Sequence, residues 1–328
     1  MEYEEVSNKE WEKIVLKSDH AYFFHSPLWA KIMEKTYNYR TATRLYEING
    51  KEILVPLMKK KKYGFNFLSS MPFYSMSFGY GGFFSKSSLS SDEIKNLIHQ
   101  ISSGRNIIFD FTMPPLSGLP LDFEDTSITK INDYWSYTHI LRLNKNFDYI
   151  WKNKFKKRAR RAIRKAVKNG VEIRKGDSLD DFKALYDIYS RASQKWGYKN
   201  PPISFDFFLN VYKYGSDHVE LSLATKDDKI IAGRICFRYS KTVYGYLNAF
   251  LPEYGTFNPT SLLISESIKQ ACDDGFKYVD VGSSGNNLGL KKFKESFGSE
   301  IIKTNTFRAY SLVGRMGSNI YKIVGNFH

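Results

Sequence analysis

The feature that most constrains the fold is an order of secondary-structure patterns that occurs twice along the 328 residues. The second half is predicted to form a strand, two helices, three antiparallel strands, a helix and a further strand. Their ranges, in that order, are 171–176, 178–194, 204–215, 219–225, 229–239, 243–250, 259–272 and 276–282. Gly170, Gly215 and Gly275 stand where one periodicity gives way to the next, which supports these boundaries.

The first half repeats this order. Two helical patterns, two strands around an Asn49-Gly50 turn, a helix and a strand follow one another, and Asn-Gly is the strongest short hairpin signal. The ranges are 8–18, 26–37, 41–48, 51–58, 90–103 and 106–111. Asp110 and Asp280 then occupy equivalent places. Many α/β proteins alternate helices and strands, but turn, helix and strand fall in step here, which favours duplication over coincidence.

This order of elements resembles that of the GNAT superfamily of acyltransferases. The resemblance implies an α/β protein made of two tandem GNAT-like domains, each a mixed twisted sheet flanked by helices. We place the domains at residues 1–145 and 146–328. A likeness in topology does not assign a substrate.

Composition narrows the class of protein. A chain with 42% hydrophobic and 16% aromatic residues is neither disordered nor fibrous. Two cysteines, Cys236 and Cys272, provide neither a disulfide framework nor a cysteine-based metal site, which points to a reducing compartment. The acidic, polar start is unlike a secretory signal, and no apolar run reaches the length of a membrane span. We therefore expect a cytoplasmic protein, and no metal, because no histidine has a second ligand at metal spacing.

A strongly basic segment lies between the two halves. Ten Lys and Arg residues occur between 152 and 168, within a net charge of +15, and the spacing predicts an amphipathic helix over 152–169 that opens the second domain. Its apolar stripe is predicted to be Phe155, Ala159, Ala162, Ile163 and Ala166. Most charge runs are solvated faces, but unbroken like charge destabilises a helix, which favours a bound anion. The anion is a tRNA phosphate, the diphosphate of a nucleotide-linked substrate or an anionic lipid headgroup. Charge alone does not choose among them.

The segment 254–298 resembles the C-terminal motif of the Fem family of peptidoglycan-bridge aminoacyltransferases. That motif is a helix, a Gly, a strand ending in Asp-x-Gly, and then Gly-x-x-x-Phe-Lys-x-x-Phe-Gly. The matching residues are Gly275, Asp280, Gly282, Gly289, Phe293, Lys294, Phe297 and Gly298. The basic segment resembles the Arg-rich segment of the family, and Phe-Phe-His-Ser-Pro-Leu-Trp at 23–29 is similar to its opening signature.

The resemblance implies an active cleft between the two domains and transfer of an activated acyl or aminoacyl group to an amine. In the best-known members the donor is aminoacyl-tRNA and the acceptor a muropeptide precursor. Lys294 matches the lysine at the catalytic centre. The residues that match or approximate substrate-binding positions are Tyr244, Tyr246, Phe293, Arg161, Arg164 and Lys31. There is no long charged heptad insertion, so the coiled-coil arm of some members is absent, and relatives outside peptidoglycan synthesis leave the acceptor open.

Aminoacyl transfer to an amine requires few catalytic groups. An aminoacyl ester is already activated, so attack by an amine needs orientation and stabilisation of the tetrahedral oxyanion. Lys294 is the candidate cation, worth about 3 kcal/mol if it resembles one oxyanion-hole donor. Without the motif it would read as an ordinary surface lysine. Asp280 is a candidate for removing a proton, or a cap of the Ser-Ser-Gly-Asn-Asn loop.

Residues 252–262 indicate which acyl donor the protein uses. Enzymes of the GNAT fold that use acyl-CoA usually place a Gly-rich turn before the third helix, whose N–H groups hold the diphosphate. Here the stretch has one glycine and a proline, Pro259, at the start of the helix. This favours aminoacyl-tRNA as co-substrate, with no other cofactor. The alternatives are a GNAT N-acyltransferase that uses acyl-CoA or acyl carrier protein, and a nucleic-acid-binding module that uses 152–168.

Overall fold

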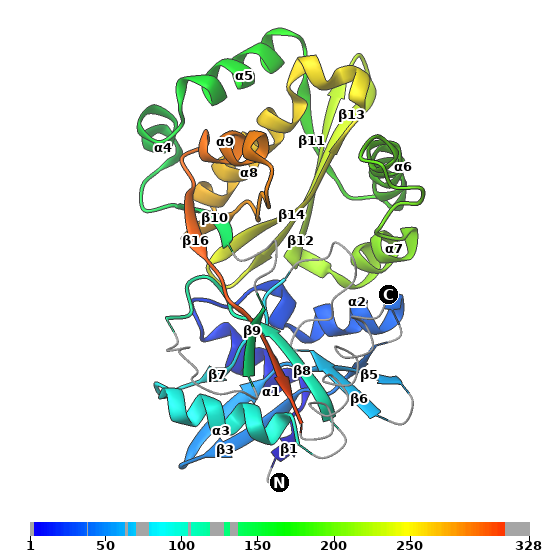
Figure 1. Cartoon of the computed structure of the whole chain (residues 1–328). Helices are drawn as coiled ribbons and strands as arrows, with labels where there is room; N and C mark the ends of the chain where they lie inside the picture. Colours follow the sequence, from blue (N-terminus) through cyan, green and yellow to red (C-terminus); the bar gives the residue numbers. More distant parts are fainter. Residues whose placement is uncertain are drawn as a thin grey trace, which may run out of the picture.

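The computed structural model describes residues 3–37, 39–62, 65–69, 79–103, 106–118, 128–131 and 137–311, which fold into three sheets flanked by helices (Figure 1). The largest sheet has seven strands in the order β11-β12-β13-β14-β15-β10-β16. Its strands are β10 (Tyr137–Arg142), β11 (Glu172–Gly176), β12 (Val219–Lys226), β13 (Lys229–Tyr239), β14 (Thr242–Phe250), β15 (Tyr278–Asp280) and β16 (Glu300–Lys303).

The other two sheets are built mainly from the first half of the chain. A four-stranded sheet has the order β1-β3-β4-β7, and a six-stranded sheet has the order β2-β5-β6-β8-β17-β9. Their strands are β1 (Tyr3–Glu5), β2 (Arg40–Thr41), β3 (Arg44–Ile48), β4 (Lys51–Val55), β5 (Met58–Lys62), β6 (Phe65–Ser69), β7 (Phe84–Ser85), β8 (Asn106–Thr112), β9 (Ile128–Ile131) and β17 (Thr306–Tyr310). Asn49 and Gly50 both have positive φ, as a tight hairpin between β3 and β4 requires.

The helices begin where the sequence offers a capping side chain. Ser7, Ser90, Asn146, Ser178 and Asn287 each accept a hydrogen bond from a backbone N–H of the first turn that follows. The helices are α1 (Asn8–Leu16), α2 (Pro27–Tyr37), α3 (Ser91–Ile101), α4 (Phe147–Asn153), α5 (Lys157–Lys168), α6 (Leu179–Lys195), α7 (Phe205–Tyr214), α8 (Pro259–Asp273) and α9 (Leu288–Glu295), with 3-10 turns at η1 (Phe23–His25), η2 (Ser216–His218) and η3 (Pro252–Phe257).

Helices cover both faces of the seven-stranded sheet (Figure 1). On one face, α4, α5 and α8 pack over residues such as Cys236 and Val279. On the other face, α6 and α7 share one aromatic core with α1, η1 and α2 from the first half of the chain. That core contains Trp29 and Phe237 and joins the two halves of the molecule.

Each half contains a pair of parallel strands joined through a helix. In the first half β6 pairs parallel with β8, and α3 lies between them in the chain. In the second half β14 pairs parallel with β15, with α8 between them. The predicted α/β fold, with mixed sheets flanked by helices, is therefore confirmed.

Two strands pair outside the half in which the sequence places them. β10 precedes residue 145 but pairs with β15 and β16, and β17 returns from the second half to pair with β8 and β9. Arg308 of β17 holds Asp110 of β8 through two hydrogen bonds of 2.6 and 2.7 Å. The boundary between 145 and 146 stays a prediction, and the sheets cross it in both directions.

The basic segment is broken into two helices, so the prediction of one helix over 152–169 is wrong at residues 154–156. Phe155 turns into the core beside Phe297, 5.3 Å between ring centroids. Arg160 then donates from Nη1 to the carbonyls of Trp151, Lys152 and Phe155, which ends α4. The predicted apolar stripe is otherwise confirmed, because α5 buries Ala159, Ile163 and Ala166.

Candidate active site

The candidate site lies where β14 and β15 separate. The two strands pair in parallel from Thr242 and Tyr278 to Tyr244 and Asp280, where β15 ends. β14 continues to Phe250, and its pairing with β13 shifts register, so that Tyr246 has no opposite residue. Within the described residues no strand pairs with this side of β14 beyond Tyr244. Beyond Tyr244 the pairing between the two strands is therefore interrupted, and this unpaired stretch, which we call the gap, lies beside the Lys294 motif.

Asp280 is the centre of a buried hydrogen-bond network. Its Oδ1 accepts from Thr138 Oγ1 at 2.6 Å and from Gly282 N at 2.8 Å. Its Oδ2 accepts from Tyr22 Oη at 3.1 Å and from Tyr80 Oη at 3.0 Å. Complete burial raises the pKa of Asp280, while these four donors oppose the rise. The carboxylate thus caps the loop after β15 and ties residues of both halves together; a role in proton removal stays a prediction.

Lys294 reaches the same loop from α9. Its Nζ donates to the carbonyl of Ser283 at 2.6 Å. Gly282 has φ +75°, which favours glycine at this turn, and its Cβ position lies 3.5 Å from Nζ, so the ammonium is in contact with the turn. Burial lowers the pKa of Lys294 to about 7; Arg234 contributes in the same direction and Asp280 opposes it. A lysine with this pKa is poised between cation and free amine at neutral pH.

Tyr244 and Tyr246 point to one face of the sheet but occupy different surroundings. Tyr244 is buried among Tyr22, Phe24 and Tyr80, with ring centroids 5.0–6.1 Å away, and it lies near Gly282. Tyr246 is only partly buried and packs against Phe207 and Phe237, with ring centroids 5.3 and 4.8 Å away. Tyr244 lies on the side of Lys294, because its Oη and Lys294 Nζ are both within 3.9 Å of the Cβ position of Gly282. Their binding roles stay predictions.

The remaining predicted site residues lie elsewhere. Phe293 packs on Phe297, 5.3 Å between ring centroids, and borders the core of α4 and α8. Arg161 and Arg164 are exposed on α5, and Arg164 lies 5.8 Å from the ring centroid of Trp151. Lys31 is exposed on α2 and lies over the ring of Tyr214 at 4.5 Å. No recorded contact brings these cations to Lys294, and their roles toward substrate stay predictions.

Sequence reasoning missed several groups that the fold brings to this site. Tyr22, Tyr80 and Thr138 bind Asp280 from 142–258 residues away, a separation that no local pattern reveals. His139 follows Thr138 on β10, and its Nε2 lies 3.0 Å from Ser284 Oγ. Burial first, and then the cationic Lys294 and Lys291, lower the pKa of His139 to about 4, so it is neutral at pH 7. In the sequence, the motif at 23–29 is the only pattern near Tyr22 that indicates a functional region.

The approach to α8 contains no glycine-rich loop. The chain forms the 3-10 turn η3, passes through Asn258 at φ +57°, and begins α8 with Pro259. Backbone N–H groups of Asn258, Ser261 and Leu262 already donate to nearby carbonyls. Few N–H groups remain here for a diphosphate, as the sequence indicated.

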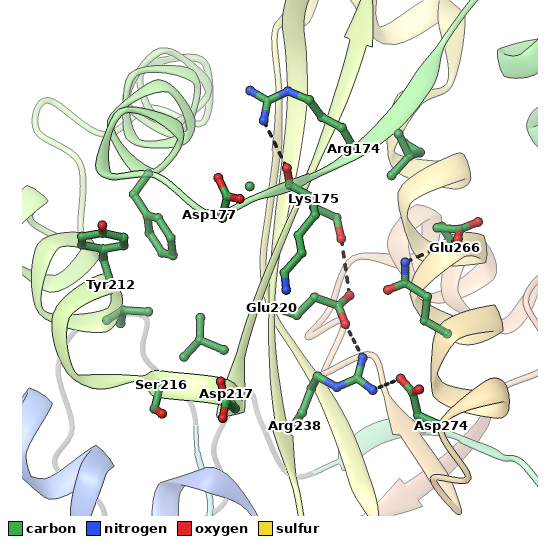
Figure 2. Close-up of a pocket in the computed structure, with 17 residues that line it drawn as sticks. Arg174, Lys175, Asp177, Tyr212, Ser216, Asp217, Glu220, Arg238, Glu266 and Asp274 are labelled. Atoms are coloured by element: carbon green, nitrogen blue, oxygen red, sulfur yellow. Dashed lines mark hydrogen bonds and ion pairs between the residues drawn. The ribbon is translucent and has the colours of Figure 1, made fainter.

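A large cavity lies apart from this gap. A cavity of about 660 Å³ lies beside β11, β12 and α8, and Figure 2 shows its lining. Arg238 there forms ion pairs with Glu220 and Asp274, so its charge is compensated within the cavity wall. Neither Lys294 nor Asp280 lines it. In the described ranges, no set of three or more His, Cys, Asp or Glu is arranged to hold a metal ion, and no helix is long and apolar enough to cross a membrane.

Comparison with known proteins supports this reading of the fold. Residues 153–295 match the family model described as an acetyltransferase (GNAT) domain. The chain is similar in structure to FemX, at 14% identity and a TM-score of 0.76, over 99% of this chain and 100% of that one.

Two further solved structures are similar. One is the C-terminal domain (DUF2156) of a putative lysylphosphatidylglycerol synthetase from Agrobacterium fabrum, at 12% identity and a TM-score of 0.59, over 97% of this chain and 98% of that one. The other is a tandem GNAT protein from the clavulanic acid biosynthesis pathway, at 9% identity and a TM-score of 0.55, over 94% and 98%. No curated protein sequence matches. At these low sequence identities the comparisons show a shared fold and do not assign substrates.

Proposed function

We propose that this chain transfers an aminoacyl group from aminoacyl-tRNA to an amine. The premise is that it is an acyltransferase, whose residues 153–295 match a GNAT acetyltransferase domain. The observation that carries the proposal is the position of Lys294. Its ammonium lies at the gap between β14 and β15, held by Ser283 beside Gly282. A donor carbonyl that lies along the unpaired edge of β14 would meet this cation.

The proposed reaction forms one C–N bond and breaks one C–O bond. The acceptor amine attacks the ester carbonyl, whose oxygen becomes an oxyanion beside the Lys294 ammonium. Collapse of this intermediate expels the ribose oxygen, which takes up the proton that the amine loses. A fixed cation that faces the developing charge is worth about 3 kcal/mol when it acts as one oxyanion-hole donor. Tyr244 borders the position of the acceptor.

The tRNA donor is favoured by two observations. The turn before α8 offers few backbone N–H groups to a CoA diphosphate. The exposed basic residues of α5, including Arg161 and Arg164, offer a surface for a polynucleotide. We propose no cofactor beyond the donor itself. Lys31 is a weaker candidate for a phosphate contact, because it lies over Tyr214.

The acceptor is proposed to be an amine of a peptidoglycan-type precursor. The likeness to FemX is one of fold, and the likeness to a lysylphosphatidylglycerol synthetase domain adds an anionic lipid to the acceptors worth testing. Contact of α5 with an anionic membrane face, in the cytoplasm, fits either acceptor. A donor made of acyl-CoA or acyl carrier protein remains the alternative.

The deciding experiment is single-turnover transfer to a panel of amine-bearing muropeptide precursors and lipids. Aminoacyl-tRNA and acyl-CoA are offered in parallel, with Lys294→Met as the catalytic variant. We expect transfer from aminoacyl-tRNA, and a rate about a hundredfold lower in the variant with nearly unchanged substrate binding. Transfer from acyl-CoA alone would replace this proposal with the alternative. Binding of tRNA without any transfer would leave only the nucleic-acid-binding reading.

A further inference from the structure

A buried arginine lies at the mouth of the same gap. Arg234 of β13 is 1% exposed. Its Nη1 donates to Asn248 Oδ1 at 2.7 Å, and its Nε lies 3.0 Å from Cys236 Sγ. Its Nη2 is buried and has no hydrogen-bond partner among the described residues. Both partners are uncharged side chains, so the guanidinium has no anion against it, which is strongly unfavourable for a buried cation.

The guanidinium leans across β14 toward the gap. A Cβ added at Gly245 would lie 2.2 Å from Nη2 and 2.8 Å from Cζ, so only glycine leaves room for the group. Gly245 is the first residue of β14 beyond its last pair with β15. Its carbonyl oxygen lies 3.9 Å from the Cβ position of Gly282, near which Lys294 Nζ also lies. Arg234 and Lys294 therefore flank the same opening.

The charges around this opening do not balance. Lys294 and Arg234 are both basic, and within the described structure the nearby carboxylates are already engaged. Asp280 is held by its four donors, and Glu220 is paired with Arg238. The Nη2 of Arg234 is therefore left without an acceptor among the described residues. Groups left unpaired in this way mark a place for an anionic ligand.

We propose that Arg234 binds a phosphate oxygen of the acyl donor as the donor lies between β14 and β15. The proposal rests on the function proposed above and adds a donor-binding residue to it. The phosphate has two possible sources, the 3′ end of a tRNA or the diphosphate of CoA. Arg234 supplies a second cation and an N–H without a partner to either, while the absence of a side chain at Gly245 leaves room for its guanidinium.

The test is donor binding measured separately from transfer. Deacylated tRNA and CoA are each added to the wild-type protein and to Arg234→Gln, and the rise in melting temperature gives the Kd. Arg238→Gln is the matched control, because it removes a buried arginine from the same face of the same strand but from the compensated cluster with Glu220. We expect Arg234→Gln to weaken binding of one donor about tenfold to a hundredfold. Its melting temperature without ligand should stay the same or rise, while Arg238→Gln should melt lower and bind donor normally.

Kinetics separate this site from the catalytic step. Arg234→Gln should raise KM for the donor and leave KM for the acceptor within about twofold of the wild-type value. Arg234→Lys keeps the charge without the planar fork, should bind donor with intermediate affinity, and serves if the Gln variant does not fold. Unchanged donor affinity in a folded variant overturns the proposal, as does a wild-type protein that binds neither tRNA nor CoA. Normal, Arg234-dependent binding without any transfer refutes the proposed function and leaves the phosphate site standing.

Discussion

The pH dependence of transfer decides whether Lys294 acts as a cation. Its pKa lies at about 7, chiefly because the side chain is buried. If the ammonium stabilises the oxyanion, kcat/KM should fall by about tenfold for each pH unit well above 7, because the protonated fraction of the free enzyme falls by that factor. If the neutral amine instead removes the proton from the acceptor, kcat/KM should rise with pH up to about 7 and then level.

The assay needs an acceptor that does not titrate in the same range. An amine that stays neutral over the whole pH range isolates the lysine, and pre-steady-state transfer isolates the chemical step. Lys294→Arg provides the control, because a guanidinium remains charged throughout and should give a flat, slower profile. A wild-type profile that is also flat, or Lys294→Met at the wild-type rate, would remove the lysine from the mechanism and leave positioning alone.

Three further predictions concern stability and binding. Asp280→Asn should lower the free energy of unfolding by about 3 kcal/mol in urea titration, because the two tyrosine hydroxyls lose a charged acceptor. Asp110→Asn, at the strand position that the sequence predicts to be equivalent, should lower it by about 1 kcal/mol, because its partner Arg308 is partly exposed. Equal losses in the two variants would contradict the network argument. Arg161→Glu with Arg164→Glu should weaken tRNA binding in filter assays without lowering the melting temperature, whereas Lys9→Glu with Lys13→Glu on α1 should not weaken it; unfolding of the first double variant would show that α5 needs these side chains. The pKa of Lys294 in the folded protein lies below its ordinary value of 10.5, so the folded state binds fewer protons than the unfolded state. The stability of the wild type, relative to Lys294→Met, should therefore rise as pH increases from about 7 to about 10.5. A stability difference that does not depend on pH in calorimetry would show that this pKa is not lowered.

Local chemistry made most elements predictable. Serine caps, the Asn49-Gly50 turn and apolar periodicity give the helices and strands nearly at their observed bounds. The error at 154–156 has a tertiary cause. A run of ten basic residues reads as one helix, but Phe155 fills a place beside Phe297 and Arg160 closes the carbonyls of α4. Neither contact can be predicted from the spacing of apolar and charged residues along a helix.

The site was predictable only where it is local in sequence. Lys294, Asp280 and Gly282 stand within one motif, and the fold brings them together as the motif indicates. Arg234 gave no signal, because an arginine in an apolar strand reads as a residue at an exposed edge. Its burial depends on Gly245, which lies on another strand and becomes its neighbour through the register of β13 and β14.

The network around Asp280 makes the loop after β15 depend on both halves of the chain. Thr138 and Gly282 hold one carboxylate oxygen from the seven-stranded sheet, while Tyr22 and Tyr80 hold the other from the first half. The segment 153–295, which matches the GNAT domain, contains only the Gly282 donor. Without the two tyrosines and Thr138, a buried carboxylate beside Lys294 would be left with one hydrogen bond, an arrangement too costly to persist. The first half therefore completes the candidate active site as well as the fold, which gives a physical reason for the two halves to share one aromatic core.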